Sequence, residues 1–285
     1  MSGGVAPIDH VVATMREQLA TIRAHEPGVR QGTDPEELHQ MRTAVRRLRA
    51  VLRLLRAVLE NDVATSRQEL RWLGHLLGAA RDADVLSAYF RSALGALAGP
   101  EAAVVERVLR RLDARRARAR RRVLAALDGP RYAQLVDTVE QTLRDPRTIE
   151  ERLHLRRIAR RQFKKLRKTV AALPHAPSDE EVHAVRITLR RARYAGELAQ
   201  ARRRRRAKRF VRRAARLQDV LGDHQDAAIA ERALRAVRRA THAGEDRVAA
   251  GRLIEQERRR RRAAWQAFED AWPTLVRRGR NAWGA

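Results

Sequence analysis

The sequence has little of several residue types that other fold and function classes require. None of its 285 residues is cysteine, which excludes a disulfide framework and thiolate metal sites. Aromatic residues make up only 4% of the chain and β-branched residues do not alternate along any run, so strands are not predicted. No apolar run reaches the length of about 18 residues that a membrane span needs, and residues 1–10 lack a signal-peptide pattern. We therefore expect an all-α, soluble, cytoplasmic protein without membrane insertion.

The charge of the chain is strongly one-sided. It has 62 Lys and Arg residues against 34 Asp and Glu residues, which gives a formal net charge of +28. Only Lys164, Lys165, Lys168 and Lys208 are lysines, so most of the charge is guanidinium, which can bind phosphate oxygens in a bidentate manner. A polyanionic partner is therefore expected: nucleic acid, an anionic membrane surface or inorganic polyphosphate.

One fourteen-residue motif occurs twice, 144 positions apart, and is called the phrase here. The helices predicted to carry its two copies are called the phrase helices. Residues 36–49 and residues 180–193 both read E-E-x-H-x-x-R-x-x-x-R-R-x-R. Further matches at the same offset, such as Leu77-Gly78 with Leu221-Gly222 and Asp82 with Asp226, indicate duplication of one helical unit. We predict two pseudo-symmetric antiparallel helical bundles, at about residues 5–145 and about 146–285, within a single domain that spans residues 1–285.

Both copies of the phrase have helix-start signals. Asp34 is placed as an N-cap with proline directly after it, and residues 178–181 form a capping box. The paired glutamates therefore serve the helix N-terminus, and we do not interpret them as catalytic acids. Apolar residues form a core seam on the first phrase helix: Met41, Val45, Leu48, Leu52, Leu55 and Leu59.

Basic residues form a stripe beside this seam. At about 100° per residue, a sector of about 80° holds His39, Arg42, Arg46, Arg49 and Arg53. A row of guanidinium groups one helical turn apart suits a chain of phosphates, and two rows that face each other would make a basic channel. The candidate residues on the two phrase helices are His39, Arg42, Arg46, Arg47, Arg49, Arg53, His183, Arg186, Arg190, Arg191 and Arg193. A third stripe, which begins at His154, adds Arg157, Arg161, Lys165 and Lys168.

Other polar residues can be explained by pairing or solvation as well as by ligand binding. Asp82 and Asp226 are predicted to hold arginines of the basic rows rather than to bind a ligand, whereas Arg81 could have either role and is kept as a candidate. The arginine runs at residues 115–122, 202–206 and 258–262 are predicted to be solvated helical charge. Taken singly, an arginine of the stripes is better explained as solvated charge, and only the repetition of the whole phrase favours a site.

These motifs resemble the CHAD family, the conserved-histidine α-helical domain. The resemblance rests on the repeated H-x-x-R-x-x-x-R-R-x-R phrase, on Arg190-Arg191-Ala192-Arg193-Tyr194 followed by Glu197, and on the L-Q-D-V-L-G segment at residues 217–222 before Asp226. It implies two helical bundles around a basic central cavity that binds inorganic polyphosphate, and association with polyphosphate granules. Arg190 and Ala192 depart from the family's usual lysine and leucine in the second motif.

The leading hypothesis is thus a non-catalytic polyphosphate-binding protein that needs no cofactor and no metal. The alternative is a nonspecific nucleic-acid-binding protein. The net positive charge favours this alternative, whereas the scarcity of aromatic residues for base stacking argues against it. A phosphoryl-transfer or polyphosphate-hydrolysing enzyme ranks third, because such chemistry usually needs carboxylate-held Mg²⁺ and the acids here cap helices or pair with arginines. No Walker-type loop or zinc-ligand spacing occurs.

Overall fold

The computed structural model describes residues 7–55, 63–144, 154–201, 204–242 and 244–284. These residues form α-helices joined by turns, with one short 3-10 helix and no strand among them, so the predicted all-α class is confirmed. The helices are α1 (Pro7–Gln31), α2 (Pro35–Leu54), α3 (Val63–Leu94), α4 (Gly99–Asp128), α5 (Pro130–Arg144), α6 (Leu155–Ala171), α7 (Asp179–Leu198), the 3-10 helix η2 (Ala199–Ala201), α8 (Arg204–Arg239) and α9 (Gly244–Trp283). Leu59 and the predicted boundary near residue 145 lie outside the described residues, and the division into two repeats stays a prediction.

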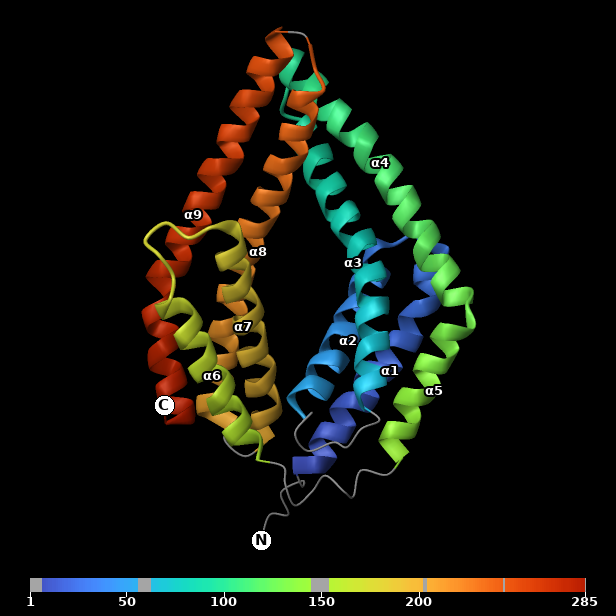
Figure 1. Ribbon diagram of the computed structural model, residues 1–285, viewed down its shortest axis with the longest axis vertical. Coiled ribbons are helices and arrows are strands. Elements are labelled where there is room, and N and C mark those ends of the chain that lie inside the picture. Colours follow the sequence, from blue (N-terminus) through green and yellow to red (C-terminus); the bar gives the residue numbers. More distant parts are fainter. Residues whose placement is uncertain (1–6, 56–62, 145–153, 202–203, 243, 285) are drawn as a thin grey trace.

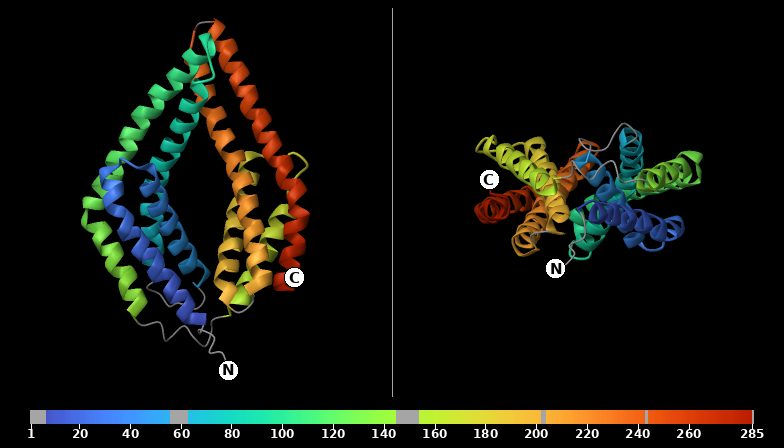
Figure 2. Two further views of the ribbon diagram at one scale, coloured as in Figure 1. Left: turned by 180° about the vertical axis from the view of Figure 1, so that it is seen from behind. Right: turned by 90° about the horizontal axis from the view of Figure 1, so that it is seen from below.

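The helices form two groups that meet at one end. Helices α1 to α5 pack together on one side, and α6 to α9 pack together on the other (Figures 1 and 2). At the upper tip in Figure 1, α3 and α4 contact α8 and α9. Helices α2 and α7 provide a further contact between the groups, lower in the molecule. No described helix combines the length and apolar character needed to cross a membrane.

Two apolar clusters stabilise this arrangement. The larger one runs through both helix groups and includes the predicted seam of α2, where Met41, Leu48, Leu52 and Leu55 are fully buried. The smaller one fills the tip, where α3 and α4 meet α8 and α9. The residues of this tip cluster are Leu86, Phe90, Val104, Val105, Val108, Leu109, Leu112, Ala230, Leu234, Val237, Ala249, Ala250, Leu253 and Ile254.

The two phrase helices begin as predicted. The Asp34 side chain accepts a hydrogen bond of 2.8 Å from the backbone N–H of Glu36, and Pro35 is the first residue of α2. At the start of α7, Ser178 and Glu181 form the reciprocal capping box. These local bonds fix where each helix starts, and hence which turn carries each basic residue.

Part of the arginine run at residues 115–122 has a structural role. Gly32 follows α1 with a φ of 67°, a left-handed conformation that favours glycine at a helix end. The Arg120 guanidinium lies against it and donates to the carbonyl oxygens of Gly32 (3.0 Å) and Gln31 (2.5 Å). The prediction that this run is only solvated charge is therefore wrong for Arg120, which caps the last carbonyls of α1 from α4.

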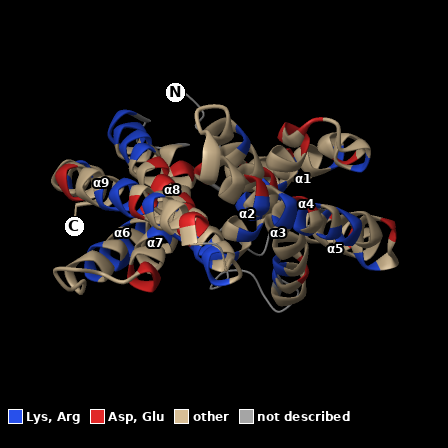
Figure 3. Ribbon diagram, turned by 90° about the horizontal axis from the view of Figure 1, so that it is seen from above, with Lys and Arg blue, Asp and Glu red and all other residues tan. Residues whose placement is uncertain are grey.

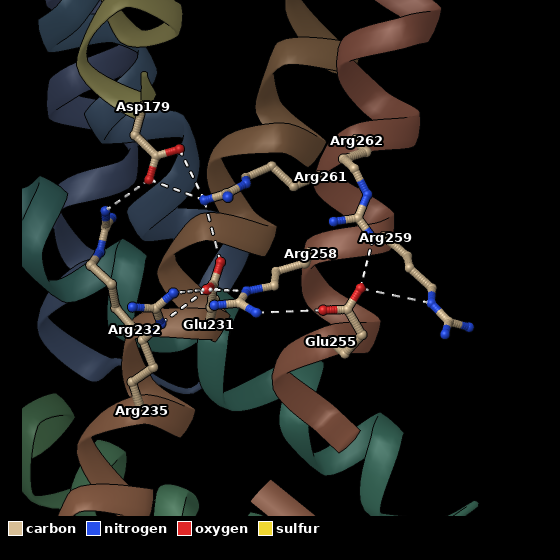
Figure 4. Close-up of polar contacts among 9 residues, drawn as sticks. All are labelled: Asp179, Glu231, Arg232, Arg235, Glu255, Arg258, Arg259, Arg261 and Arg262. Atoms are coloured by element: carbon tan, nitrogen blue, oxygen red, sulfur yellow. Dashed lines mark hydrogen bonds and ion pairs between the residues drawn. The ribbon is translucent and has the colours of Figure 1, made fainter. Parts of the chain in front are cut away.

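The run at residues 258–262 is also paired rather than only solvated. Glu231 of α8, whose side chain is 3% exposed, accepts hydrogen bonds from Arg235 and from Arg258 of α9 (Figure 4). Arg261 of α9 lies 3.2 Å from Glu231 and 3.1 Å from Asp179 at the start of α7. The prediction of solvated charge is therefore wrong for Arg258 and Arg261, because they join three helices through one buried carboxylate.

Helix α6 is held in place by close packing on α9. A Cβ atom at Gly279 of α9 would stand only 2.2 Å from the ring of Phe163, so a side chain at this position is sterically excluded. Phe163 is fully buried and makes an edge-to-face contact with Phe210 of α8, with ring centroids 5.6 Å apart. This apolar anchoring turns the basic face of α6 away from the core.

Candidate anion-binding site

The basic rows of α2 and α7 lie side by side and in register. Both helices run toward the lower end of the molecule in Figure 1. Arg46 of α2 donates a hydrogen bond of 3.1 Å from Nε to the hydroxyl oxygen of Tyr194 on α7. Arg46 also acts electrostatically on Arg190, and Arg186 acts on Arg42, so residues 144 positions apart in the sequence meet in space.

Between these helices lies a basic pocket with a volume of about 420 Å³. Side chains from α2, α3, α6 and α7 line it, so both helix groups contribute. Among the described residues that line it, none is acidic. Its basic residues are Arg46, Arg49, Arg53, Arg67, Arg161, Lys165, Arg190 and Arg191. We call this the basic pocket. Figure 3 shows that both helix groups carry many Lys and Arg residues.

Arg190 is the most perturbed cation of the basic pocket. Burial, together with the charges of Arg186 and Arg46, lowers its pKa to about 10. The side chain is still cationic at neutral pH, although both desolvation and repulsion by neighbouring arginines destabilise its charged form. Among the described residues, no carboxylate forms an ion pair with Arg190. A buried cation that is held among like charges at a cost in stability marks a functional-site candidate for an anion.

Repulsion also extends along the lower part of the basic pocket. Burial and the charges of Arg71, Arg53 and Arg67 lower the pKa of Arg49. Burial and the charges of Arg53 and Arg49 lower the pKa of Arg191. The two helices therefore present mutually repelling cations, and an anion between them would relieve that repulsion.

Above the basic pocket the rows are partly neutralised. Arg42 lies 3.3 Å from the carboxylate of Asp82 on α3, as predicted for a buttressing aspartate. Burial raises the pKa of Asp226 on α8, and the nearby Arg186 acts against that rise without a direct ion pair. Arg81 donates to the Pro35 carbonyl oxygen (3.1 Å) and does not line the basic pocket. The neutralising carboxylates found among the described residues therefore lie toward the upper end of the rows.

The two phrase histidines lie outside the basic pocket. His39 is half-buried, and burial together with the charges of Arg81, Arg46 and Arg42 lowers its pKa. His183 is exposed. Both stand one turn before the first arginine of their row, above the basic pocket. Anion contact by either histidine stays a prediction.

Arg47 and Arg193 lie near Glu197 of α7 rather than in the basic pocket. The Arg193 Nε lies 3.3 Å from a Glu197 carboxylate oxygen, without the alignment of a hydrogen bond, and its guanidinium stands over the Tyr194 ring. Burial raises the pKa of Glu197, while the charges of Arg193 and Arg47 act in the opposite direction. The contacts of Arg193 lie within α7, and Arg47 reaches that helix only through its electrostatic effect on Glu197.

The α6 stripe is divided between two places. Arg161 and Lys165 line the basic pocket. Lys168 instead lines a second hollow, beside Lys164 and Arg167 and next to α9. Arg157 is exposed and lines neither.

Comparison with known protein families agrees with this geometry. The family model described as the CHAD domain matches residues 13–235. The chain belongs to the CHAD domain family. The match ends within α8, so α9 lies beyond it although α9 packs along α8 in the same helix group.

Relatives and solved structures extend the likeness over most of the CHAD chain. The uncharacterized proteins MT2285 and Rv2226 of Mycobacterium tuberculosis are each 30% identical to it over 276 residues, which is 90% of this chain and 51% of theirs. The chain thus spans about half the length of these relatives. The crystal structure of the CHAD domain from the plant Ricinus communis has a TM-score of 0.75 and 29% identity, covering 95% of this chain and 93% of that one. PptA from Streptomyces chartreusis has a TM-score of 0.77 and 24% identity, covering 93% and 99%, and shares the fold.

Two residues that line the basic pocket of this CHAD protein were not predicted from the sequence. Arg67 of α3 and Tyr194 of α7 both line it, and neither is among the predicted site residues. Arg67 has no basic counterpart in the repeat, because Val211 stands 144 positions further on. The available signal was the Arg67–Arg71 spacing of one helical turn, followed after another turn by Gly74, where α3 approaches Val45 of α2.

Proposed function

We propose that this CHAD protein binds inorganic polyphosphate, without cleaving it, in the basic pocket between α2, α3, α6 and α7. The observation that supports the proposal is the lining of that pocket by eight basic and no acidic described residues. Guanidinium groups hold phosphate oxygens through paired N–H donors, and a polymer of linked phosphates offers each of them an anionic partner. The structure of the free protein holds the Arg190 charge at an energetic cost that a polyanion would offset.

Further parts of the proposal concern the cellular setting. Binding of this kind would place the protein in the cytoplasm at polyphosphate granules. Nucleic acid is the competing ligand, since a net charge of +28 attracts any polyanion. The basic pocket favours polyphosphate because its one aromatic lining residue, Tyr194, is 3% exposed and bonded to Arg46, which leaves no ring for base stacking.

Competition between polyanions tests the proposal. Affinities for long-chain polyphosphate, duplex DNA and single-stranded RNA would be measured across a salt series at equal phosphate concentration. We expect polyphosphate to bind most tightly and to stay bound in excess nucleic acid. Equal affinity for all three polymers would mean that the basic surface attracts polyanions nonspecifically. Mg²⁺-dependent release of phosphate from polyphosphate by the pure protein would refute the proposal that the protein does not cleave its ligand.

Binding is expected to depend on pH through His39. In the free protein its pKa lies below the usual value because of burial and the charges of Arg81, Arg46 and Arg42. A bound polyanion favours the protonated ring and so raises this pKa, which means that binding takes up a proton. Affinity should therefore rise as the pH falls through the pKa of the bound state, and stay constant well above it. Titration of wild type against His39→Gln checks this, since the variant should show a flatter profile; identical profiles would remove His39 from the site.

A further inference from the structure

Helix α6 carries a dense run of uncompensated positive charge among the described residues. Its 17 residues contain no Asp or Glu, and its basic residues are Arg156, Arg157, Arg160, Arg161, Lys164, Lys165, Arg167 and Lys168. None of them forms an ion pair with any carboxylate in the part of the chain that the structure describes. Three of the four lysines of the chain lie here. In contrast, Arg258 of α9 is paired with the buried Glu231 and Arg261 with Asp179 at the start of α7.

The second hollow adjoins α6 on a face next to the one that lines the basic pocket. It has a volume of about 600 Å³ and is lined by Lys164, Arg167, Lys168, Val170, Ala171, Trp272 and Val276. We call it the outer hollow. Its wall on α9 is rigid, because Trp272 stacks on Phe268 with centroids 5.7 Å apart, and Phe268 stacks on Trp265 at 5.1 Å. Among the described residues that line it, none is acidic.

A continuous basic strip joins the two hollows. Arg161 and Lys165 line the basic pocket, whereas Lys164 and Lys168 line the outer hollow. At about 100° per residue these four side chains fall within a sector of about 100°, and they span about 10 Å along the helix axis. All four are exposed. An anionic chain that leaves the basic pocket over α6 therefore meets further cations and no acid of α6.

We infer that the outer hollow is a second subsite for polyphosphate, in which Lys164, Arg167 and Lys168 hold the part of a long chain that extends beyond the basic pocket. The inference rests on the proposed function. Lysine suits this place because its ammonium group is a compact charge on a flexible stem and can follow a polymer without a fixed geometry. Two subsites on one chain act as a bivalent site, so affinity should grow with chain length once both are spanned.

The packing of α6 argues against a membrane surface as the occupant. An interfacial helix inserts an exposed apolar face into the bilayer. The apolar face of α6, with Leu155, Ala159, Phe163 and Leu166, is buried in the protein core instead. Only the charged face is left for a ligand, which favours a soluble linear polyanion.

Matched variants test the role of the outer hollow. Lys164→Gln, Arg167→Gln and Lys168→Gln would be combined in one protein, and Arg111→Gln, Arg115→Gln and Arg118→Gln on the exposed face of α4 in a control with the same loss of charge. We expect the first variant to lose affinity for long-chain polyphosphate by on the order of tenfold or more relative to the control. Its affinity for tripolyphosphate, which the basic pocket can hold alone, should equal that of the control.

The outcomes separate this inference from the proposed function. Equal long-chain affinities in the two variants would overturn the outer subsite. The proposed function would still stand if Arg46→Gln with Arg190→Gln weakens binding of both ligands. If that pocket variant weakens neither, the proposed function fails, and the outer subsite fails with it.

Lysine footprinting supplies a test on the wild-type protein, where no variant can misfold. Acetylation of amines followed by mass spectrometry reports each lysine separately, with exposed Lys208 of α8 as the internal reference. Tripolyphosphate should protect Lys165, and long-chain polyphosphate should also protect Lys164 and Lys168. Unchanged reactivity of Lys164 and Lys168 with the long chain would overturn the inference. Equal protection by duplex DNA would assign the outer hollow to nucleic acid and refute polyphosphate as its specific ligand.

Discussion

Replacing Arg46 and Arg190 together with glutamine is expected to weaken long-chain polyphosphate binding by on the order of 100-fold at moderate salt. Each residue contributes a cation to the basic pocket, and a charge-assisted hydrogen bond is worth about 1.5 kcal/mol or more. The plot of log affinity against log salt concentration should also become shallower, by roughly 1 to 2 units for two lost phosphate contacts. Isothermal titration calorimetry across a salt series measures both quantities.

The same double variant should unfold at a higher urea concentration than wild type. Burial and like-charge neighbours disfavour the Arg190 cation in the free protein, so its removal relieves repulsion between α2 and α7. The matched control replaces Arg115 and Arg118 of α4, which are exposed, and should change neither pocket affinity nor stability by much. Weakened binding with lowered stability would instead mean that the two arginines hold the fold, and that the basic pocket is lost only indirectly.

Replacing Glu231 with glutamine should destabilise the protein by about 2–3 kcal/mol, less than for a fully buried ion pair, because its three arginine partners are 30–46% exposed. The carboxylate is 3% exposed and lies within 3.2 Å of nitrogen atoms on Arg235, Arg258 and Arg261. Without it, three guanidinium groups would face one another in the junction of α8, α9 and the start of α7 (Figure 4). Urea unfolding followed by circular dichroism measures the change.

The pH dependence of stability provides a second test of the contribution that Glu231 makes to folding. Burial alone would raise its pKa, but the hydrogen bonds from Arg235 and Arg258 outweigh burial and hold the pKa below its usual value. The carboxylate therefore contributes stability above its unfolded-state pKa, and that contribution is lost as the pH falls through the folded-state pKa. Glu231→Gln should flatten the stability profile in this acidic window. Glu255→Gln is the control, because Glu255 belongs to the same network but is 40% exposed; equal losses in the two variants would contradict the argument.

Local patterns predicted the helices that carry the site. The seam of α2, the Asp34 cap and the capping box at Ser178 depend on residues within a few positions of one another, and the structure has all three. The positions of Arg46 and Arg190 on one face of their helices follow from the same periodicity.

Contacts between distant segments were beyond the reach of those patterns. Arg47 and Arg193 repeat as faithfully as Arg46 and Arg190, yet they lie near Glu197, because the rotation of α2 against α7 decides which side of each row faces the basic pocket. The run at residues 258–262 was predicted to be solvated because Glu231 and Asp179, the partners of Arg258 and Arg261 on other helices, cannot be found from local spacing. Periodicity places a side chain on a helix face but does not say what that face meets.

The bond between Arg46 and Tyr194 has a consequence for the order of events during synthesis and folding. Its two residues are 148 positions apart in the chain, and other walls of the basic pocket come from Arg67 and Arg161, so the pocket consists of non-local contacts. Such contacts form late, because a long loop must close before they can stabilise anything. On the ribosome, α2 and α3 emerge well before α6 and α7 exist. The nascent chain therefore displays four of the eight basic residues of the pocket, Arg46, Arg49, Arg53 and Arg67, before it can enclose a phosphate polymer. Selectivity arises only after α6 and α7 have folded back.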